Sequence, residues 1–321
     1  MAGSGPVGAS MADVAACYRL LLQRPPDAGG LEHYRGRVDE GIGVPELVDE
    51  FLGSVEFARA HGRHGKPQQA PSELVVTREG FRIHVDPSDF AVGHTIARTA
   101  GYEEDVSAEV RRLLGRGQTF VDVGANIGWF SLLAAALVGP EGRVVAVEPN
   151  PANVTLLRQS AKENGFDNID VIGVALAEKA GAVALETDGS NGRIIPIDGP
   201  PAQPVGASFV VASYPLDTIL AQAGVGRVDL MKIDVEGAEP LVLRGGAATL
   251  ARDRPVLITE FYPLALECSP WGSPEGYLAS LRQLGYELSV IGTDGPGDDA
   301  SIMALAGSGG NDHVDLLARP L

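Results

Sequence analysis

The chain has 321 residues, of which 45% are hydrophobic and 21% are charged, a balance typical of a globular protein with a sizeable core. Its formal net charge is −17, which argues against a nucleic-acid partner, because such proteins need a basic surface. The longest purely apolar run, Leu132–Val138, is too short to span a membrane, and the first ten residues do not form a secretion signal, so a cytoplasmic protein is predicted.

The N-terminal part of the chain predicts a small helical module. Residues 1–10 have the composition of a disordered lead, and residues 11–60 have helical periodicity that Pro and Gly interrupt. Residues 61–73 are polar and rich in Gly, Pro and Gln, as in a linker. Residues 74–321 are therefore predicted to form a second, larger domain.

Strands and helices alternate through this larger domain. A hairpin is predicted around Glu79-Gly80 and a helix over 103–114. Strands are then predicted at 119–123, 143–148, 169–174, 228–234, 255–261 and 286–291, with helices that begin near residues 126, 151, 238 and 274. Such alternation predicts an α/β fold, a parallel sheet covered on both faces that binds its ligand at the carboxyl ends of the strands.

Two later segments have less regular patterns. Residues 301–307, SIMALAG, are predicted to add a final, antiparallel strand. Residues 188–207 are rich in Gly and Pro, and we interpret them as a mobile loop over the site.

The run DVGANIG, which follows the strand at 119–123, is the first candidate for ligand binding. Gly124 permits a tight turn and close approach to a ligand, and Gly128 permits close packing of the next helix. The next predicted strand ends in Glu148, about twenty residues later, where a carboxylate in this kind of fold accepts the hydroxyl hydrogens of a ribose. The combination predicts a nucleoside site.

The turn favours one class of nucleoside over another. A pyrophosphate-binding turn has the pattern G-x-G-x-x-G, but here Asn126 takes the place of the second glycine, and no basic side chain stands ready for phosphate. Asp122 repels a pyrophosphate and suits a ligand with an ammonium group. The charge of the turn therefore favours S-adenosylmethionine over NAD.

Four stretches together resemble the FkbM-type family of adenosylmethionine-dependent methyltransferases: VDVGANIGWFSLLAA, VVAVEPNPANVTLL, VDLMKIDVEGAEPLVLRGG and VLITEF. The resemblance implies a seven-stranded, Rossmann-like class I methyltransferase fold after the helical module, and methylation of hydroxyl groups on sugars or polyketide-like small molecules. It implies that these residues bind the cofactor: Asp122, Gly124, Ala125, Asn126, Gly128, Glu148 and Ala175.

Several carboxylates converge after the strand 228–234. Side chains alternate along a strand, so Lys232 and Asp234 share one face, while Glu236 follows in the turn and Glu260 ends the next strand. Three interpretations stay open. A carboxylate, Asp234 or Glu236, is the general base for the acceptor hydroxyl; or Asp234, Glu236 and Glu260 hold Mg²⁺; or Lys232 and Asp234 form a structural ion pair while Glu239 starts a helix. The first is favoured, and no metal is expected.

Three further residues are weaker candidates for contact with the acceptor. His94 and Tyr102 precede the first strand of the predicted sheet, and Arg193 lies in the glycine-rich segment, where it is placed to grip an acidic group of a substrate. Two other functions remain as alternatives: a non-catalytic binding or scaffold protein, and an NAD-dependent oxidoreductase.

The helical module has a resemblance of its own. LLLQRPPDAGGLEHYRGRVDEG and GSVEFA are similar to a small helical domain of bacterial surface-layer proteins that is related to phycobilisome linkers. The resemblance implies a docking or dimerisation unit. The alternative is an appendage that only packs on the larger domain.

Overall fold

The computed structural model describes residues 9–22, 24–52, 54, 72–196, 207–293, 295, 297–307 and 312–321. The predicted helical module is present as three helices, α1 (Met11–Leu21), α2 (Ala28–Asp39) and α3 (Val44–Leu52). Ser10 caps α1 in a reciprocal capping box with Asp13, and Ala9 is buried. These two residues, assigned to a disordered lead from the sequence, therefore belong to the module. Most of the predicted linker lies outside the described residues.

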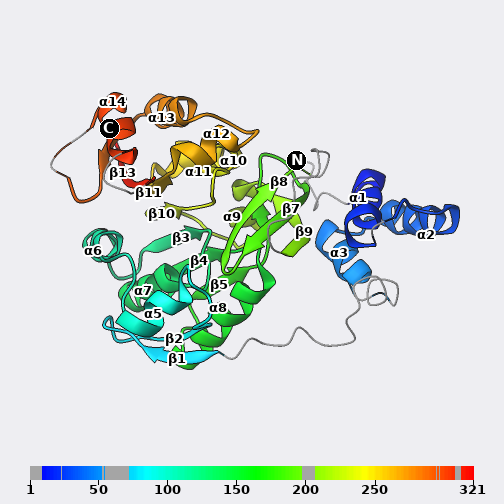
Figure 1. The fold of residues 1–321 in the computed structure, drawn as a ribbon, viewed down its shortest axis with the longest axis horizontal. Helices are drawn as coiled ribbons and strands as arrows, with labels where there is room; N and C mark the ends of the chain where they lie inside the picture. The colour runs from blue at the N-terminus through cyan, green and yellow to red at the C-terminus, as the bar shows by residue number, and fades with distance from the viewer. Residues whose placement is uncertain are drawn as a thin grey trace.

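The larger part of the chain is built on a seven-stranded sheet with the order β12-β13-β11-β10-β3-β4-β5 (Figure 1). Its strands are β3 (Thr119–Val123), β4 (Arg143–Val147), β5 (Ile169–Ile172), β10 (Leu230–Ile233), β11 (Val256–Phe261), β12 (Tyr286–Val290) and β13 (Val314–Pro320). The pairs among β5, β4, β3, β10 and β11 are parallel, and β13 runs antiparallel between β11 and β12. This strand order, with one antiparallel strand inserted next to the edge, is the Rossmann-like class I methyltransferase fold.

Both faces of this sheet are buried, as the apolar strands predict. Phe120 and Leu230 lie in the hydrophobic cluster of one face, whereas Val121 and Met231 lie in the cluster of the other. The first face is covered by α5 (Gly93–Thr99), α6 (Glu104–Leu113), α7 (Trp129–Val138) and α8 (Pro151–Asn164). The second is covered by α9 (Leu216–Gln222), α10 (Glu239–Gly245), α11 (Ala247–Asp253), α12 (Pro263–Cys268), α13 (Pro274–Gln283) and α14 (Asp299–Ala306).

Two smaller sheets complete the fold. The predicted hairpin is present as β1 (Glu73–Val76) and β2 (Arg82–Val85). The sequence did not indicate the second sheet, which has the order β6-β9-β7-β8 and consists of β6 (Ala175–Leu176), β7 (Gly181–Asp188), β8 (Asn191–Ile195) and β9 (Ala207–Tyr214). The helical module packs here: α1 and α3 contact β9 (Figure 1), and their buried side chains share one cluster with Val210 and Tyr214.

Two sequence predictions about local structure are wrong. Residues 301–307 are mostly helical, because Asp298 caps α14 through Ser301 N and the buried Ile302 and Ala306 have the four-residue spacing of a helix face. The antiparallel strand of the sheet is β13 instead. The segment 188–207 is not simply a loop, since its first residues form β8, while residues 197–206 lie outside the described part of the chain.

None of the helices in the described residues is long and apolar enough to cross a membrane.

Candidate functional site

A cavity of about 370 Å³ opens at the carboxyl ends of the central parallel strands. Its walls come from the turns after β3, β4, β10 and β11, from the tip of the β7–β8 hairpin and from the start of α6. Parallel sheets of this kind bind ligands where neighbouring strands diverge, and the order β10-β3-β4 places that point at β3. The cavity thus lies where the sequence predicted it.

The turn after β3 is held in shape by its own backbone. The N–H groups of Gly124 and Ala125 both donate to the carbonyl of Val147 at the end of β4. Gly124 has φ of +81°, and a Cβ atom there would lie 1.8 Å from the carbonyl oxygen of Asp234. Glycine is therefore needed because the turns after β3 and β10 touch. At Gly128 a Cβ atom would lie 2.1 Å from Leu157 on α8, so this glycine permits close packing against that helix; it does not line the cavity, although it was predicted to contact the cofactor.

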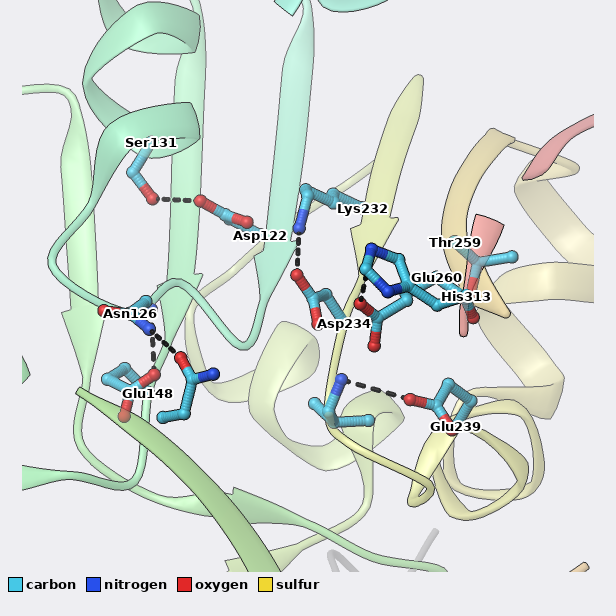
Figure 2. Close-up of polar contacts among 12 residues, drawn as sticks. Asp122, Asn126, Ser131, Glu148, Lys232, Asp234, Glu239, Thr259, Glu260 and His313 are labelled. Atoms are coloured by element: carbon cyan, nitrogen blue, oxygen red, sulfur yellow. Dashed lines mark hydrogen bonds and ion pairs between the residues drawn. The ribbon is translucent and has the colours of Figure 1, made fainter. Parts of the chain in front are cut away.

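Glu148 connects the turn to the cavity. Its Oε2 accepts a hydrogen bond of 2.8 Å from Asn126 N (Figure 2). Its Oε1 accepts from Asn150 N at 2.8 Å and from the Asn153 amide at 3.3 Å. Burial raises the pKa of Glu148 to about 7, although these donors oppose the shift. A carboxylate has about four lone-pair sites, so three donors leave room for a ribose hydroxyl.

The hairpin tip covers this end of the cavity. Ser190, at the turn between β7 and β8, accepts a hydrogen bond of 2.8 Å from the Asn153 amide through its carbonyl oxygen. Its N–H donates to Asp89 Oδ1 at 3.1 Å, and Asp89 Oδ2 in turn accepts from the N–H groups of Val92 and Gly93. Asp89 therefore ties the hairpin tip to the start of α5 above the predicted cofactor site.

Asp122 lies behind the cavity wall and is not one of its lining residues. Its side chain is buried, and its Oδ2 accepts a hydrogen bond of 2.6 Å from the hydroxyl of Ser131 on α7 (Figure 2). No described residue donates to Oδ1. Burial raises the pKa of Asp122 to about 6, opposed by the charge of Lys232, its register partner on β10. Asp122, predicted to contact the cofactor, is therefore hydrogen-bonded within the protein and does not reach the cavity surface.

Lys232 and Asp234 form the predicted pair. The ammonium donates to Asp234 Oδ2 at 2.6 Å (Figure 2) and lies 4.8 Å from the ring centre of Phe130. Burial alone would lower the pKa of Lys232, but the carboxylates of Asp234, Glu103 and Asp122 raise it above its ordinary value. The lysine is therefore a fixed positive charge in the cavity wall, and the pair leaves Asp234 Oδ1 for other contacts.

Three glutamates complete the acidic side of the cavity. Glu236 and Glu103 line it with left-handed backbones, φ of +53° and +40°, which cost energy in residues other than glycine. Burial raises the pKa of each of them. Glu260, from β11, also lines the cavity, and burial together with the carboxylates of Asp234 and Glu236 raises its pKa well above the ordinary value. Strained backbones that aim carboxyl groups into a cavity mark a functional site.

Glu239 has a structural role, as the third interpretation held. It begins α10, is buried, and its Oε1 accepts hydrogen bonds of 3.2 Å from the N–H groups of Val235 and Gly237 (Figure 2). Within the residues that the structure describes, no three side chains of His, Cys, Asp or Glu are grouped as a metal site.

The structure brings most of the predicted residues together around the cavity: Tyr102, Gly124, Ala125, Asn126, Glu148, Ala175, Lys232, Asp234, Glu236 and Glu260. His94 does not line it and packs against Phe90, and Arg193 pairs with Glu186 instead. Glu103, Tyr262 and His313 also line the cavity, although the sequence did not indicate them as site residues. The only signal for Tyr262 was its place just after a strand, and His313 carried none, because β13 had not been recognised.

Comparison with known proteins identifies methyltransferases as the similar proteins. A family model described as "Methyltransferase FkbM domain" matches residues 122–288. A protein-L-isoaspartate O-methyltransferase of Ignicoccus hospitalis is 26% identical over 170 residues, which are 52% of this chain and 71% of that protein. A probable cobalt-precorrin-6B C(15)-methyltransferase of Sulfolobus acidocaldarius is 38% identical over 56 residues, 17% of this chain and 29% of that protein.

Solved structures with a similar fold include an FkbM methyltransferase from Methylobacillus flagellatus, which is 15% identical with a TM-score of 0.41. The match covers 94% of this chain and 58% of that one. A precorrin-6y C5,15-methyltransferase from Geobacter metallireducens is 14% identical with a TM-score of 0.40, over 74% of this chain and 92% of that one. At these values the likeness carries no argument about the acceptor.

Proposed function

This chain belongs to the FkbM family of methyltransferases and is therefore an S-adenosylmethionine-dependent methyltransferase, and from that premise we propose that it methylates a hydroxyl group of a small molecule, such as a sugar or a glycan precursor. The observation that carries the proposal is the division of one cavity into two ends. One end is formed by the turn after β3 and by Glu148, and the other by the acidic side chains after β10 and β11.

The residues at the first end suit the cofactor. Glu148 has one acceptor site left for a ribose hydroxyl, and the apolar side chains of Val174, Ala175 and Ile194 suit the flat faces of an adenine ring. Asp122, behind the wall, favours a cationic group near the turn. When bound, S-adenosylmethionine supplies a methyl group activated by a positively charged sulfur.

The second end suits a hydroxyl-bearing acceptor. Ionised carboxylates only accept hydrogen bonds, and hydroxyl groups are the donors that sugars offer in number. Asp234 Oδ2 is occupied by Lys232, so Oδ1 is the oxygen that we assign to the acceptor hydroxyl. Holding that hydroxyl in line with the methyl group lowers the barrier without further chemistry from side chains. Asp234 is thus proposed to orient the acceptor, with Glu236 beside it.

A deletion strain tests the proposal even while the acceptor is unidentified. Metabolites and glycans from the strain, complemented with the wild-type chain or with Asp234→Asn, are compared by mass spectrometry. We expect a methylated hydroxyl compound that the wild type restores and the variant does not, while purified Asp234→Asn still binds S-adenosylhomocysteine. If Asp234→Asn restores the compound fully, Asp234 does not orient the acceptor.

A further inference from the structure

An aspartate–histidine pair lies at the start of β13, on the acceptor side of the cavity. His313 Nδ1 is 3.2 Å from Asp312 Oδ1. Asp312 is fixed in turn, since its Oδ2 accepts a hydrogen bond of 2.8 Å from the hydroxyl of Tyr262. Hydrogen bonds from Tyr262 and His313 also lower the pKa of Asp312. The aspartate therefore stays ionised and can only accept.

This geometry determines which nitrogen of His313 is free. An ionised carboxylate next to Nδ1 requires that Nδ1 carry the hydrogen, so in the neutral imidazole Nε2 keeps its lone pair. Nε2 lies 3.9 Å from Glu260 Oε1, which is too far for a hydrogen bond (Figure 2). His313 lines the cavity, so this lone pair is available to a group bound between His313 and the carboxylates.

The charges around His313 come from every neighbouring element. Carboxyl groups outnumber the cations there. These groups are Glu260 on β11, Glu236 in the turn after β10, Glu103 at the start of α6, Asp315 on β13 and the adjacent Asp312, with the hydroxyl of Tyr262 as the neutral neighbour and Lys232 as the nearby cation.

We infer that His313 is the general base of the reaction and that Asp312 and Tyr262 are positioning residues that hold its tautomer. The inference rests on the proposed transfer to a hydroxyl group. As the acceptor oxygen forms its bond to the methyl carbon, the sulfur–methyl bond breaks with its electron pair left on sulfur, and the hydroxyl proton moves to His313 Nε2. The positive charge lost from sulfur thus reappears on an imidazolium surrounded by carboxylates.

His313 suits this role better than the carboxylates near it. Asp234 already accepts a hydrogen bond from Lys232, and its free oxygen serves to orient the hydroxyl. The proton must also leave the site after each turnover. The side chain of His313 is 44% exposed, whereas that of Glu260 is 16% exposed, so the imidazole has the better path to water.

The tautomer of His313 tests the inference without any acceptor. The full chain is labelled with ¹⁵N-histidine, saturated with S-adenosylhomocysteine, and examined by long-range ¹H–¹⁵N NMR, with His313→Gln used to assign the signal. We expect an Nδ1–H tautomer for neutral His313, converted to Nε2–H by Asp312→Asn, while His33, on α2 of the helical module, is unchanged. An Nε2–H tautomer in the wild type would overturn the inference and leave the proposed function standing.

Kinetics supply the second test, with the acceptor that the deletion strain identifies. His313→Gln should lower kcat by about 10²- to 10⁴-fold, the range for loss of a general base, with little change in KM for S-adenosylmethionine. Added imidazole should restore part of the rate of His313→Ala but none of that of Asp234→Asn. Full activity in His313→Gln would refute the inference. Absence of any methylated hydroxyl with the wild type would refute the proposed function and the inference with it.

Discussion

At the scale of single residues, Glu148 has two tasks that both need its ionised form, whereas burial favours the protonated form. Its carboxylate stabilises the turn after β3 through hydrogen bonds from backbone N–H groups, and it faces the cavity as the proposed partner of the ribose. Burial raises its pKa to about 7, so the empty site holds a proton below that pH. The affinity for the cofactor should therefore depend on pH.

We predict that S-adenosylhomocysteine binds more weakly as pH falls below about 7, by up to tenfold per pH unit, because protonation of Glu148 removes the acceptor site for the ribose hydroxyl. Glu148→Gln should lower affinity about 10- to 100-fold at pH 7.5, which corresponds to the loss of one hydrogen bond to a charged group. It should also abolish this pH dependence. Titration calorimetry measures both effects.

Glu239→Gln is the matched control, because Glu239 is also buried, also accepts backbone N–H bonds and also has a pKa raised by burial to about 7, but does not line the cavity. It should lower stability and leave affinity unchanged. Equal losses of affinity in both variants would mean that Glu148 acts only through the fold.

Residues of the candidate site could be predicted where they lie at the end of a strand that the sequence makes recognisable. Glu148, Asp234 and Glu260 each end or follow a predicted strand, so their convergence followed from the parallel order. His313 lies 79 residues after Asp234 in the chain and reaches the same cavity only because β13 inserts between β11 and β12. Its place depends on a long-range strand pairing, which local periodicity does not encode.

At the scale of elements, the β7–β8 hairpin covers the cofactor end of the cavity. The sequence predicted that the segment 188–207 covers the site but not that its start belongs to a strand pair, because eight of its twenty residues are glycine or proline. Asp89 is the residue that joins the hairpin tip to the start of α5. Hydrogen bonds from Gly93 and Ser190 lower the pKa of Asp89 against the effect of its burial.

Asp89→Ala should therefore destabilise the position of the β7–β8 hairpin over the cavity. We expect faster hydrogen exchange in residues 189–194 and about tenfold weaker binding of S-adenosylhomocysteine, since ordering the hairpin then costs about 1–2 kcal/mol of the binding free energy. Asp86→Ala is the control on the same loop, because Asp86 binds only Ser88 among the described contacts of its side chain. If the hydrogen-exchange rates of the hairpin are the same in both variants, the hydrogen bonds of Asp89 do not hold the hairpin in place.

At the scale of the whole molecule, the buried acidic groups make stability depend on pH. Burial raises the pKa of Asp122 to about 6 and those of Glu148, Glu239 and Asp315 to about 7, above their ordinary values of 3.8 for aspartate and 4.5 for glutamate. The folded chain thus binds more protons than the unfolded chain between about pH 4 and pH 7. The stability that these groups contribute is complete below their ordinary pKa values and is lost as pH rises through the raised ones.

We predict that the melting temperature falls as pH increases from about 5 to about 7.5 and then levels off. Each such group changes the free energy of unfolding by at most about 1.4 kcal/mol per pH unit. Glu239→Gln should flatten the slope without affecting the cavity. Scanning calorimetry across this range measures the effect, and a melting temperature that rises with pH would contradict the assignment of these carboxyls.

The helical module packs directly on the larger domain, since its buried side chains belong to the same hydrophobic cluster as those of β9. This packing could not be predicted, because β9 itself was not recognised in the sequence. That the module also docks a partner or a second copy stays a prediction.

The central claim is that the acidic end of the cavity directs the methyl group to oxygen. Incubation of the purified chain with S-adenosyl-[methyl-¹³C]methionine and a small-molecule and glycan extract, followed by ¹H–¹³C NMR, reads the atom that receives the methyl group from its chemical shift. We predict new O-methyl signals, strong with the wild type and nearly absent with Asp234→Asn. Label that appears only on nitrogen, carbon or sulfur would show that the methyl acceptor is not a hydroxyl group.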